Sequence, residues 1–104
     1  MSIIGGKVVR DGHVAVLVSG GYGAGWSTWG SVSVFDPDMV EAVERGDSPE
    51  QLVALAETLY PEEYVGGAEQ LSVRWIPEGT LFRIEEYDGS ESLELASNVQ
   101  WMEA

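Results

Sequence analysis

The residue types that most often carry out catalysis are scarce in this sequence. There is no cysteine, and the single histidine, His13, follows an Asp-Gly pair and has no nucleophile at a matching spacing. Around Ser27 the sequence reads GWSTW, which lacks the second glycine of the G-x-S-x-G nucleophile elbow. We therefore expect a protein that is not an enzyme and that uses no cofactor.

The only clustered residues that could bind a metal are carboxylates. Glu85, Glu86 and Asp88, with Glu91 just after the next turn, form the densest group. Adjacent residues of a strand point to opposite faces, so Glu85 and Glu86 do not form one paired site. A solvated acidic strand edge, which discourages strand-to-strand aggregation, explains the group with fewer assumptions than a divalent cation does. A metal-dependent enzyme is therefore our third alternative, and we assign no metal ligand.

Residues 19–30 read SGGYGAGWSTWG and combine glycines with three aromatic rings, Tyr22, Trp26 and Trp29. The segment lacks the Gly-Lys-Ser/Thr of a phosphate-binding P-loop and the G-x-G-x-x-G of a dinucleotide site. Glycine allows a close approach to the backbone, and rigid rings supply stacking area. Such a segment is either a recognition surface for a flat ring or a protein partner, or a structural loop whose tryptophans fill the core.

The chain is strongly acidic: its 104 residues include 18 aspartates and glutamates against 5 lysines and arginines, a net charge of −13. The basic residues are scattered, which disfavours direct binding of nucleic acid. The acidity serves either solubility alone or the docking of an acidic face onto a basic partner. The sequence has no cysteine, no N-terminal targeting pattern and no apolar stretch of membrane-spanning length, so we expect a cytoplasmic protein that does not bind a membrane.

Turn signals and hydrophobic periodicity predict one α+β domain over residues 1–104. Asp36 and Ser48 are placed as N-caps of two short helices, which end near Gly46 and Tyr60. The expected strands span residues 6–10, 13–18, 31–35, 71–76, 81–87 and 92–96, with a last short strand around residues 99–101. We predict that an N-terminal hairpin and a C-terminal meander form one antiparallel sheet of about five or six strands, with the two helices inserted in the middle and packed on one side.

The chain resembles a family of small, mostly uncharacterised proteins of tailed bacteriophages. The resemblance runs from about residue 14 and rests on SGGYGAGWSTW, on YPEEYVGGAEQLSVRWIPEGTLFRIEEYDGSESL and on a tryptophan near the C-terminus. It implies a protein that acts by binding a host component and so modulates or inhibits host physiology or defence. The contact residues that the resemblance suggests are Tyr22, Gly23, Gly25, Trp26, Ser27, Thr28, Trp29, Tyr64, Gly66, Gly67, Glu86, Tyr87 and Asp88.

Two kinds of partner fit this resemblance. The first is a protein of the bacterial host cell, contacted through the surface rich in glycine and tryptophan. The alternative is a small nucleotide-like signal molecule, which an oligomer of this chain would bind or sequester by stacking it between Trp26 or Trp29 and a neighbour. The sequence leaves open the target, the oligomeric state and the exposure of the two tryptophans.

Overall fold

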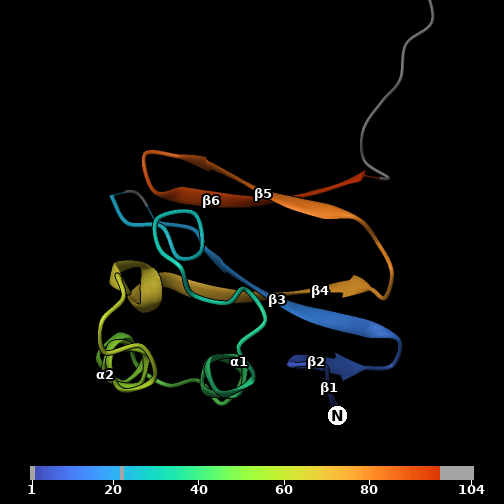
Figure 1. Cartoon of the computed structure of the whole chain (residues 1–104), viewed down its shortest axis with the longest axis horizontal. Helices are drawn as coiled ribbons and strands as arrows, with labels where there is room; N and C mark the ends of the chain where they lie inside the picture. Colours follow the sequence, from blue (N-terminus) through green and yellow to red (C-terminus); the bar gives the residue numbers. More distant parts are fainter. Residues whose placement is uncertain (1, 22, 97–104) are drawn as a thin grey trace, which may run out of the picture.

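Six strands and two α-helices make up the regular structure of the described residues (Figure 1). The computed structural model describes residues 2–21 and 23–96. In chain order the elements are β1 (Ser2–Ile4), β2 (Lys7–Arg10), β3 (His13–Ser19), α1 (Pro37–Glu44), α2 (Pro49–Leu59), the 3-10 turn η1 (Gly66–Gln70), β4 (Leu71–Pro77), β5 (Phe82–Tyr87) and β6 (Ser90–Leu95). The α+β class predicted from the sequence is confirmed.

The strands form two sheets, and the prediction of a single sheet is wrong. One antiparallel sheet has the order β1-β2-β3-β4, while β5 and β6 form a separate two-stranded sheet. After β4 the chain turns over residues 78–81, and the β5–β6 hairpin then lies over one face of β3 (Figure 1). The composition of β3 explains this arrangement. Its residues 14–18, VAVLV, are all buried, so both faces of this strand need an apolar cover.

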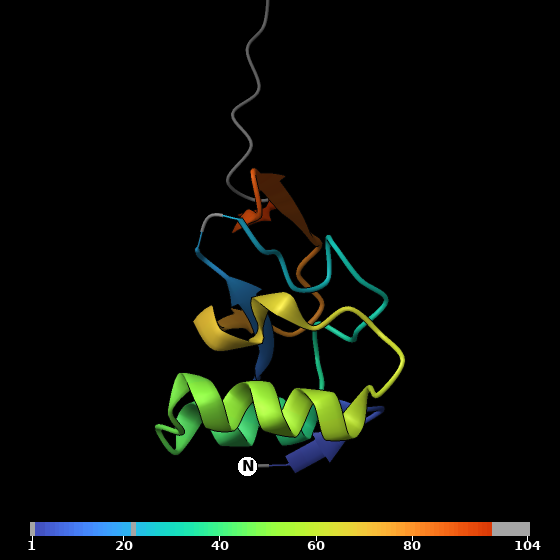
Figure 2. The same cartoon turned by 90° about the vertical axis from the view of Figure 1, so that its left-hand side faces the viewer.

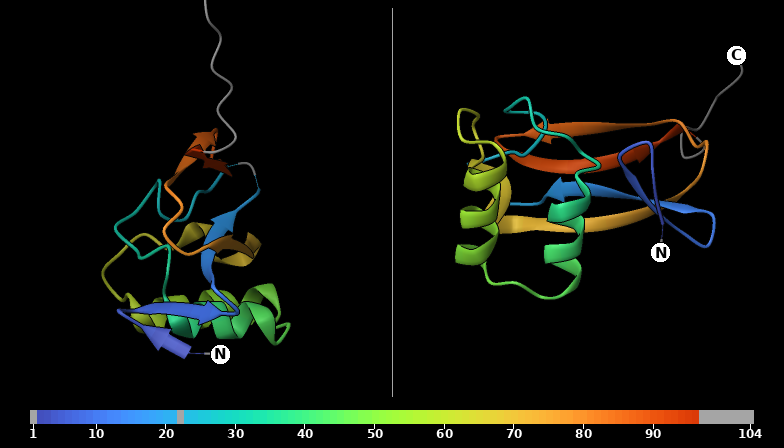
Figure 3. Two further views of the ribbon diagram at one scale, coloured as in Figure 1. Left: turned by 90° about the vertical axis from the view of Figure 1, so that its right-hand side faces the viewer. Right: turned by 60° about the horizontal axis from the view of Figure 1, so that its bottom comes forward.

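β3 is the centre of three layers. Ala15 and Leu17 face the helices and belong to the larger apolar core. Val14, Val16 and Val18 face the other way, toward the apolar side chains of the hairpin. Figure 2 shows both helices on the side of β3 away from the hairpin, and in the right-hand view of Figure 3 α1 crosses β3 and β4 while α2 lies beside α1 and against η1. Both helices therefore pack on one side of the sheet, as predicted.

Both helices begin at the residues that the sequence indicates. The Asp36 carboxylate accepts hydrogen bonds from the backbone N–H groups of Asp38 and Met39, which caps α1. The Ser48 hydroxyl accepts from the backbone N–H of Gln51, and the Gln51 side chain accepts from that of Ser48. The predicted capping box of α2 is thus confirmed.

Tight turns connect the hairpins. Asp11 and Gly12 have φ values of 51° and 75°, and Asp88 and Gly89 have values of 49° and 87°. These left-handed pairs suit the twist of two-residue hairpin turns, and they confirm both Asp-Gly turns read from the sequence. The structure adds a strand that we did not predict, β1, which joins β2 through a Gly-Gly turn at residues 5–6.

Residues 31–35 do not form the strand that we predicted. Strand geometry would place Val32 and Val34 on the same face, whereas Val32 belongs to the helix-side core and Val34 packs with the hairpin-side core. The segment passes around the edge of β3 instead, where Leu17 donates its backbone N–H to the Val34 carbonyl at 2.8 Å. The strand predicted around residues 99–101 lies outside the described residues.

Tyr60 links the ends of the two helices. It is the C-cap of α2, and its hydroxyl donates a hydrogen bond to Asp36, the N-cap of α1. Burial and this hydrogen bond raise the pKa of Tyr60 to about 12. The fold therefore favours the neutral ring. Since the pKa of an unfolded tyrosine is about 10, this contribution to stability is fully present below pH 10 and is lost as the pH rises toward 12.

We predict that Tyr60→Phe flattens the alkaline decline in stability. The wild type should lose part of its free energy of unfolding between about pH 10 and the folded-state pKa, and the variant should lose less over that interval because its ring has no proton to release. Denaturant midpoints of both proteins across this pH series measure the difference. Groups that titrate alike in both proteins cancel, so two parallel curves would contradict the prediction.

Candidate interaction surface

One buried carboxylate holds the glycine-rich segment in place. Glu91, at the start of β6, is only 4% exposed. Its Oε1 accepts a hydrogen bond from Ser19 N (2.9 Å), and its Oε2 accepts from Trp26 N (2.8 Å), Thr28 N (3.0 Å) and the Thr28 hydroxyl (2.6 Å). Four donors thus converge on one charge, which satisfies it away from water and fixes a segment that has no regular structure.

The glycines of this region allow backbones to touch. At Gly67, in η1, a Cβ atom would lie 2.5 Å from the carbonyl oxygen of Gly25, and at Gly89 it would overlap the backbone N of Ala24. Gly23 also donates its N–H to the Asp88 carbonyl at 2.6 Å. The segment is therefore clamped between η1 and the β5–β6 turn (Figure 1). This close approach explains why positions 67 and 89 are glycine.

Trp26 belongs to the core. Its side chain is fully buried, and its indole N–H donates to the Ser33 carbonyl at 3.1 Å. The ring meets Tyr60 edge to face, with ring centroids 6.1 Å apart and planes at 80°. The sequence left open whether this ring forms a recognition surface or fills the core, and Trp26 fills the core. Its ring lies out of reach of a partner, and its assignment as a contact residue is corrected here.

Trp29 has the opposite environment. It is 40% exposed and lies against Tyr64, which is 44% exposed, with ring centroids 5.9 Å apart and planes at 38°. Gly30 lets the two loops meet, since a Cβ there would lie 2.7 Å from the Tyr64 carbonyl oxygen. We call Trp29 and Tyr64 the aromatic pair. The structure therefore brings together two residues that the sequence suggested from separate segments.

The neighbourhood of the aromatic pair carries negative charge. Glu62 and Glu63 precede Tyr64 and are exposed. All five basic residues lie in other segments, on β2, β4, β5 and at the end of α1. Nothing cationic in segments 19–35 or 60–70 offsets these two carboxylates. The exposed rings and the adjacent acids therefore present a surface complementary to a cation.

The other suggested contact residues are dispersed or serve the fold. The Thr28 hydroxyl is bound to Glu91, and Ser27 is half-buried. Gly66 packs against the Tyr64 ring. The carboxylate of Glu86 accepts from the backbone N–H of Gly89 at 2.9 Å. Tyr87 and Asp88 are exposed on the hairpin, and Tyr22 lies outside the described residues.

The single histidine and the carboxylates form no metal-binding cluster in the part of the chain that the structure describes. His13 is exposed, and its Nδ1 lies 3.0 Å from the Asp11 carbonyl oxygen. Within residues 2–21 and 23–96, no three histidine, aspartate or glutamate side chains gather in a way that could hold a metal ion. The same residues contain no helix with the length and apolar character needed to span a membrane.

Comparison with known proteins identified no relative: no family model, no curated protein and no solved structure matches the chain.

Sequence reasoning missed the role of Glu91. We grouped it with Glu85, Glu86 and Asp88 as a solvated acidic edge, but it faces inward. The alternation of the strand could have revealed this role. Glu91 shares the inward face of β6 with Leu93 and Leu95, two and four residues further on. A carboxylate on the same face of a strand as apolar side chains indicates a buried charge that needs hydrogen-bond donors.

We predict that Glu91→Gln lowers the free energy of unfolding by about 3 kcal/mol. The amide has one acceptor oxygen, and its NH₂ group would face backbone N–H donors. The matched control is Glu86→Gln, directly across the hairpin from Glu91, which should cost less than about 1 kcal/mol because this carboxylate is exposed and accepts one bond. Denaturant unfolding measures both, and equal losses would contradict the clamp.

We predict that Gly89→Ala is more damaging than Gly12→Ala. Both glycines have φ values near +80° (87° and 75°), so both variants carry the same backbone strain of about 1–2 kcal/mol. Only at Gly89 does the added Cβ collide with neighbouring backbone, while at Gly12 it meets open space. We expect Gly89→Ala to lose at least about 2 kcal/mol more than Gly12→Ala in denaturant unfolding. Similar losses would show that the segment is not clamped at the turn.

Proposed function

We propose that this protein is a non-enzymatic binding protein and that the aromatic pair is the centre of its contact surface. The observation that carries the proposal is an exposed tryptophan in contact with an exposed tyrosine, on a loop that the buried Glu91 carboxylate holds. Tryptophan and tyrosine are enriched among the few residues that supply most of the binding energy in protein interfaces.

Rigidity supports this assignment. Trp29 directly follows Thr28, whose N–H and hydroxyl are both bound to the buried Glu91 carboxylate. Binding to a mobile loop loses free energy because the loop must be ordered, whereas a loop that is already ordered avoids this cost. The segment is therefore suited to present a ring in one orientation.

Charge indicates the kind of partner. The chain has a net charge of −13, and the exposed residues Glu62 and Glu63 directly precede the exposed Tyr64. A protein surface that presents arginine or lysine would gain cation–π contacts with the pair and attraction from the surrounding acids. From the resemblance to small phage proteins, we infer that this partner is a protein of the bacterial host and that binding modulates its physiology or defence.

A nucleotide-like ligand fits the surface less well. The rings of the aromatic pair are already in contact, with centroids 5.9 Å apart, so a base could stack only on an outer face. Its phosphates would also be repelled by a chain with a net charge of −13, in which the exposed residues Glu62 and Glu63 directly precede Tyr64. We therefore favour the protein partner and treat the nucleotide as an outcome of the test.

The test is a pull-down from bacterial lysate followed by calorimetry on the captured protein. We predict that Trp29→Ala weakens binding by about 30-fold or more, the effect of losing a hot-spot residue. Tyr64→Ala should also weaken it, and added salt should weaken binding to the wild type. The control is Ile3→Ala, a similarly exposed apolar residue on β1, which should leave the affinity unchanged.

Two results would overturn the proposal. One is a captured partner whose affinity is the same for Trp29→Ala, provided that thermal unfolding shows the variant to be folded. The other is a rise in melting temperature with a pool of nucleotides that disappears in Trp29→Ala, which would establish the alternative of a nucleotide-binding protein.

A further inference from the structure

A second site lies at the end of the β5–β6 hairpin that is farther from Glu91. Between the hairpin and the sheet is a pocket of about 330 Å³. Its lining includes buried Val14 and Ile76, the rings of Phe35 and Phe82, half-buried Thr80 and exposed Lys7. Pockets that bind small molecules have volumes of this order and combine an apolar lining with few polar groups.

The two phenyl rings give the pocket a defined wall. Phe35 and Phe82 meet edge to face, with centroids 5.9 Å apart and planes at 85°. The Lys7 ammonium nitrogen lies 4.7 Å from the centroid of the Phe35 ring. The wall thus consists of apolar carbon with one cation beside it.

The charge of Lys7 is not neutralised within the described residues. Arg45 pairs with Glu41 and Asp47, and Arg83 pairs with Glu85. For Lys7, no carboxylate of the described chain lies within ion-pair distance, and its contact there is the Phe35 ring. An ammonium at an apolar pocket, in a chain with few bases, selects an anion.

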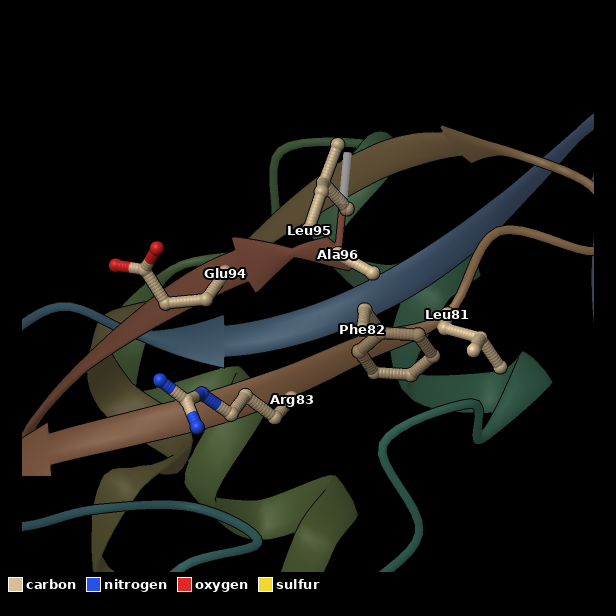
Figure 4. Close-up of a pocket in the computed structure, with 6 residues that line it drawn as sticks. All are labelled: Leu81, Phe82, Arg83, Glu94, Leu95 and Ala96. Carbon is tan, nitrogen blue, oxygen red and sulfur yellow. The ribbon is translucent and has the colours of Figure 1, made fainter. Parts of the chain in front are cut away.

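The apolar lining continues beyond this pocket. Leu81 and Phe82 also line an adjoining hollow of about 200 Å³, with Leu95 and Ala96 and with the charged residues Arg83 and Glu94. Figure 4 shows these four side chains gathered at the end of the hairpin. Leu81 is 77% exposed, which leaves a large apolar side chain in water. An elongated ligand could therefore place a charged head at Lys7 and an aliphatic chain along Leu81.

We propose that this pocket binds a small amphiphilic anion, a free medium-chain carboxylate, with its carboxylate at Lys7 and its chain against Phe82 and Leu81. This site is separate from the aromatic pair, since neither Trp29 nor Tyr64 lines the pocket or the adjoining hollow.

The experiment uses octanoate as the probe and isothermal titration calorimetry of the full chain as the readout. We expect saturable binding, with an affinity at least about tenfold lower in Lys7→Gln because the carboxylate loses its charged partner. The matched control is Arg74→Gln, which removes one exposed positive charge from β4 outside the pocket and should bind octanoate like the wild type. Octanol, which has the same chain without the charge, should bind at least about tenfold more weakly than octanoate.

Several outcomes would overturn the proposal: no octanoate binding, equal binding of octanol, or unchanged affinity in Lys7→Gln. A fourth outcome that would overturn the proposal is a dimer that octanoate separates into monomers, because the pocket would then be an interface between two copies of the chain. Sedimentation of the chain with and without octanoate tests for it. We expect Trp29→Ala to bind octanoate like the wild type, although it should lose affinity for the protein partner. The octanoate titration therefore tests this pocket separately from the proposed function.

Discussion

The buried carboxylate of Glu91 is the interaction on which the rest of this structure depends. A charge with 4% exposure must be fully hydrogen-bonded, and the partners here are N–H groups of Ser19, Trp26 and Thr28 with one hydroxyl. Ser19 is the last residue of β3, and the other donors belong to residues 26–28, a segment without helix or strand. The charge and the segment therefore need each other, and neither is stable in this position alone.

This dependence gives the glycine-rich segment two roles. Trp26 is directed inward, where it fills the core between the helices and β3, and Trp29 is directed outward against Tyr64. The Glu91 carboxylate binds the residue at 26 and the residue at 28, so it fixes the chain on both sides of the point where the direction changes. One ring anchors the segment, and the other is presented on a rigid support.

Local features of the fold could be predicted from the sequence, because each depends on residues close together in the chain. The two helix caps and the Asp-Gly turns are of this kind. The assembly of the strands was less accessible. A continuous apolar run such as residues 14–18 shows that β3 is covered on both faces, but not that the second cover is a separate hairpin. The directions of Trp26 and Trp29 depend on Glu91, more than 60 residues away in the chain, and no local pattern contains that contact.

The placement of the few cations bears on both proposed sites. Among the described residues, Arg45 and Arg83 form ion pairs, Lys7 lies over Phe35, and Arg10 lies over Trp75, at 4.7 and 4.6 Å from the ring centroids. Two cations of β2 thus lie against aromatic rings of the same chain, Phe35 before α1 and Trp75 on β4. The aromatic pair has no such contact among the described residues, although it is exposed and two exposed acids directly precede Tyr64. The rings of this pair are therefore open to a cation of another molecule, which is the physical reason to look for a basic partner at this surface and for an anion at Lys7.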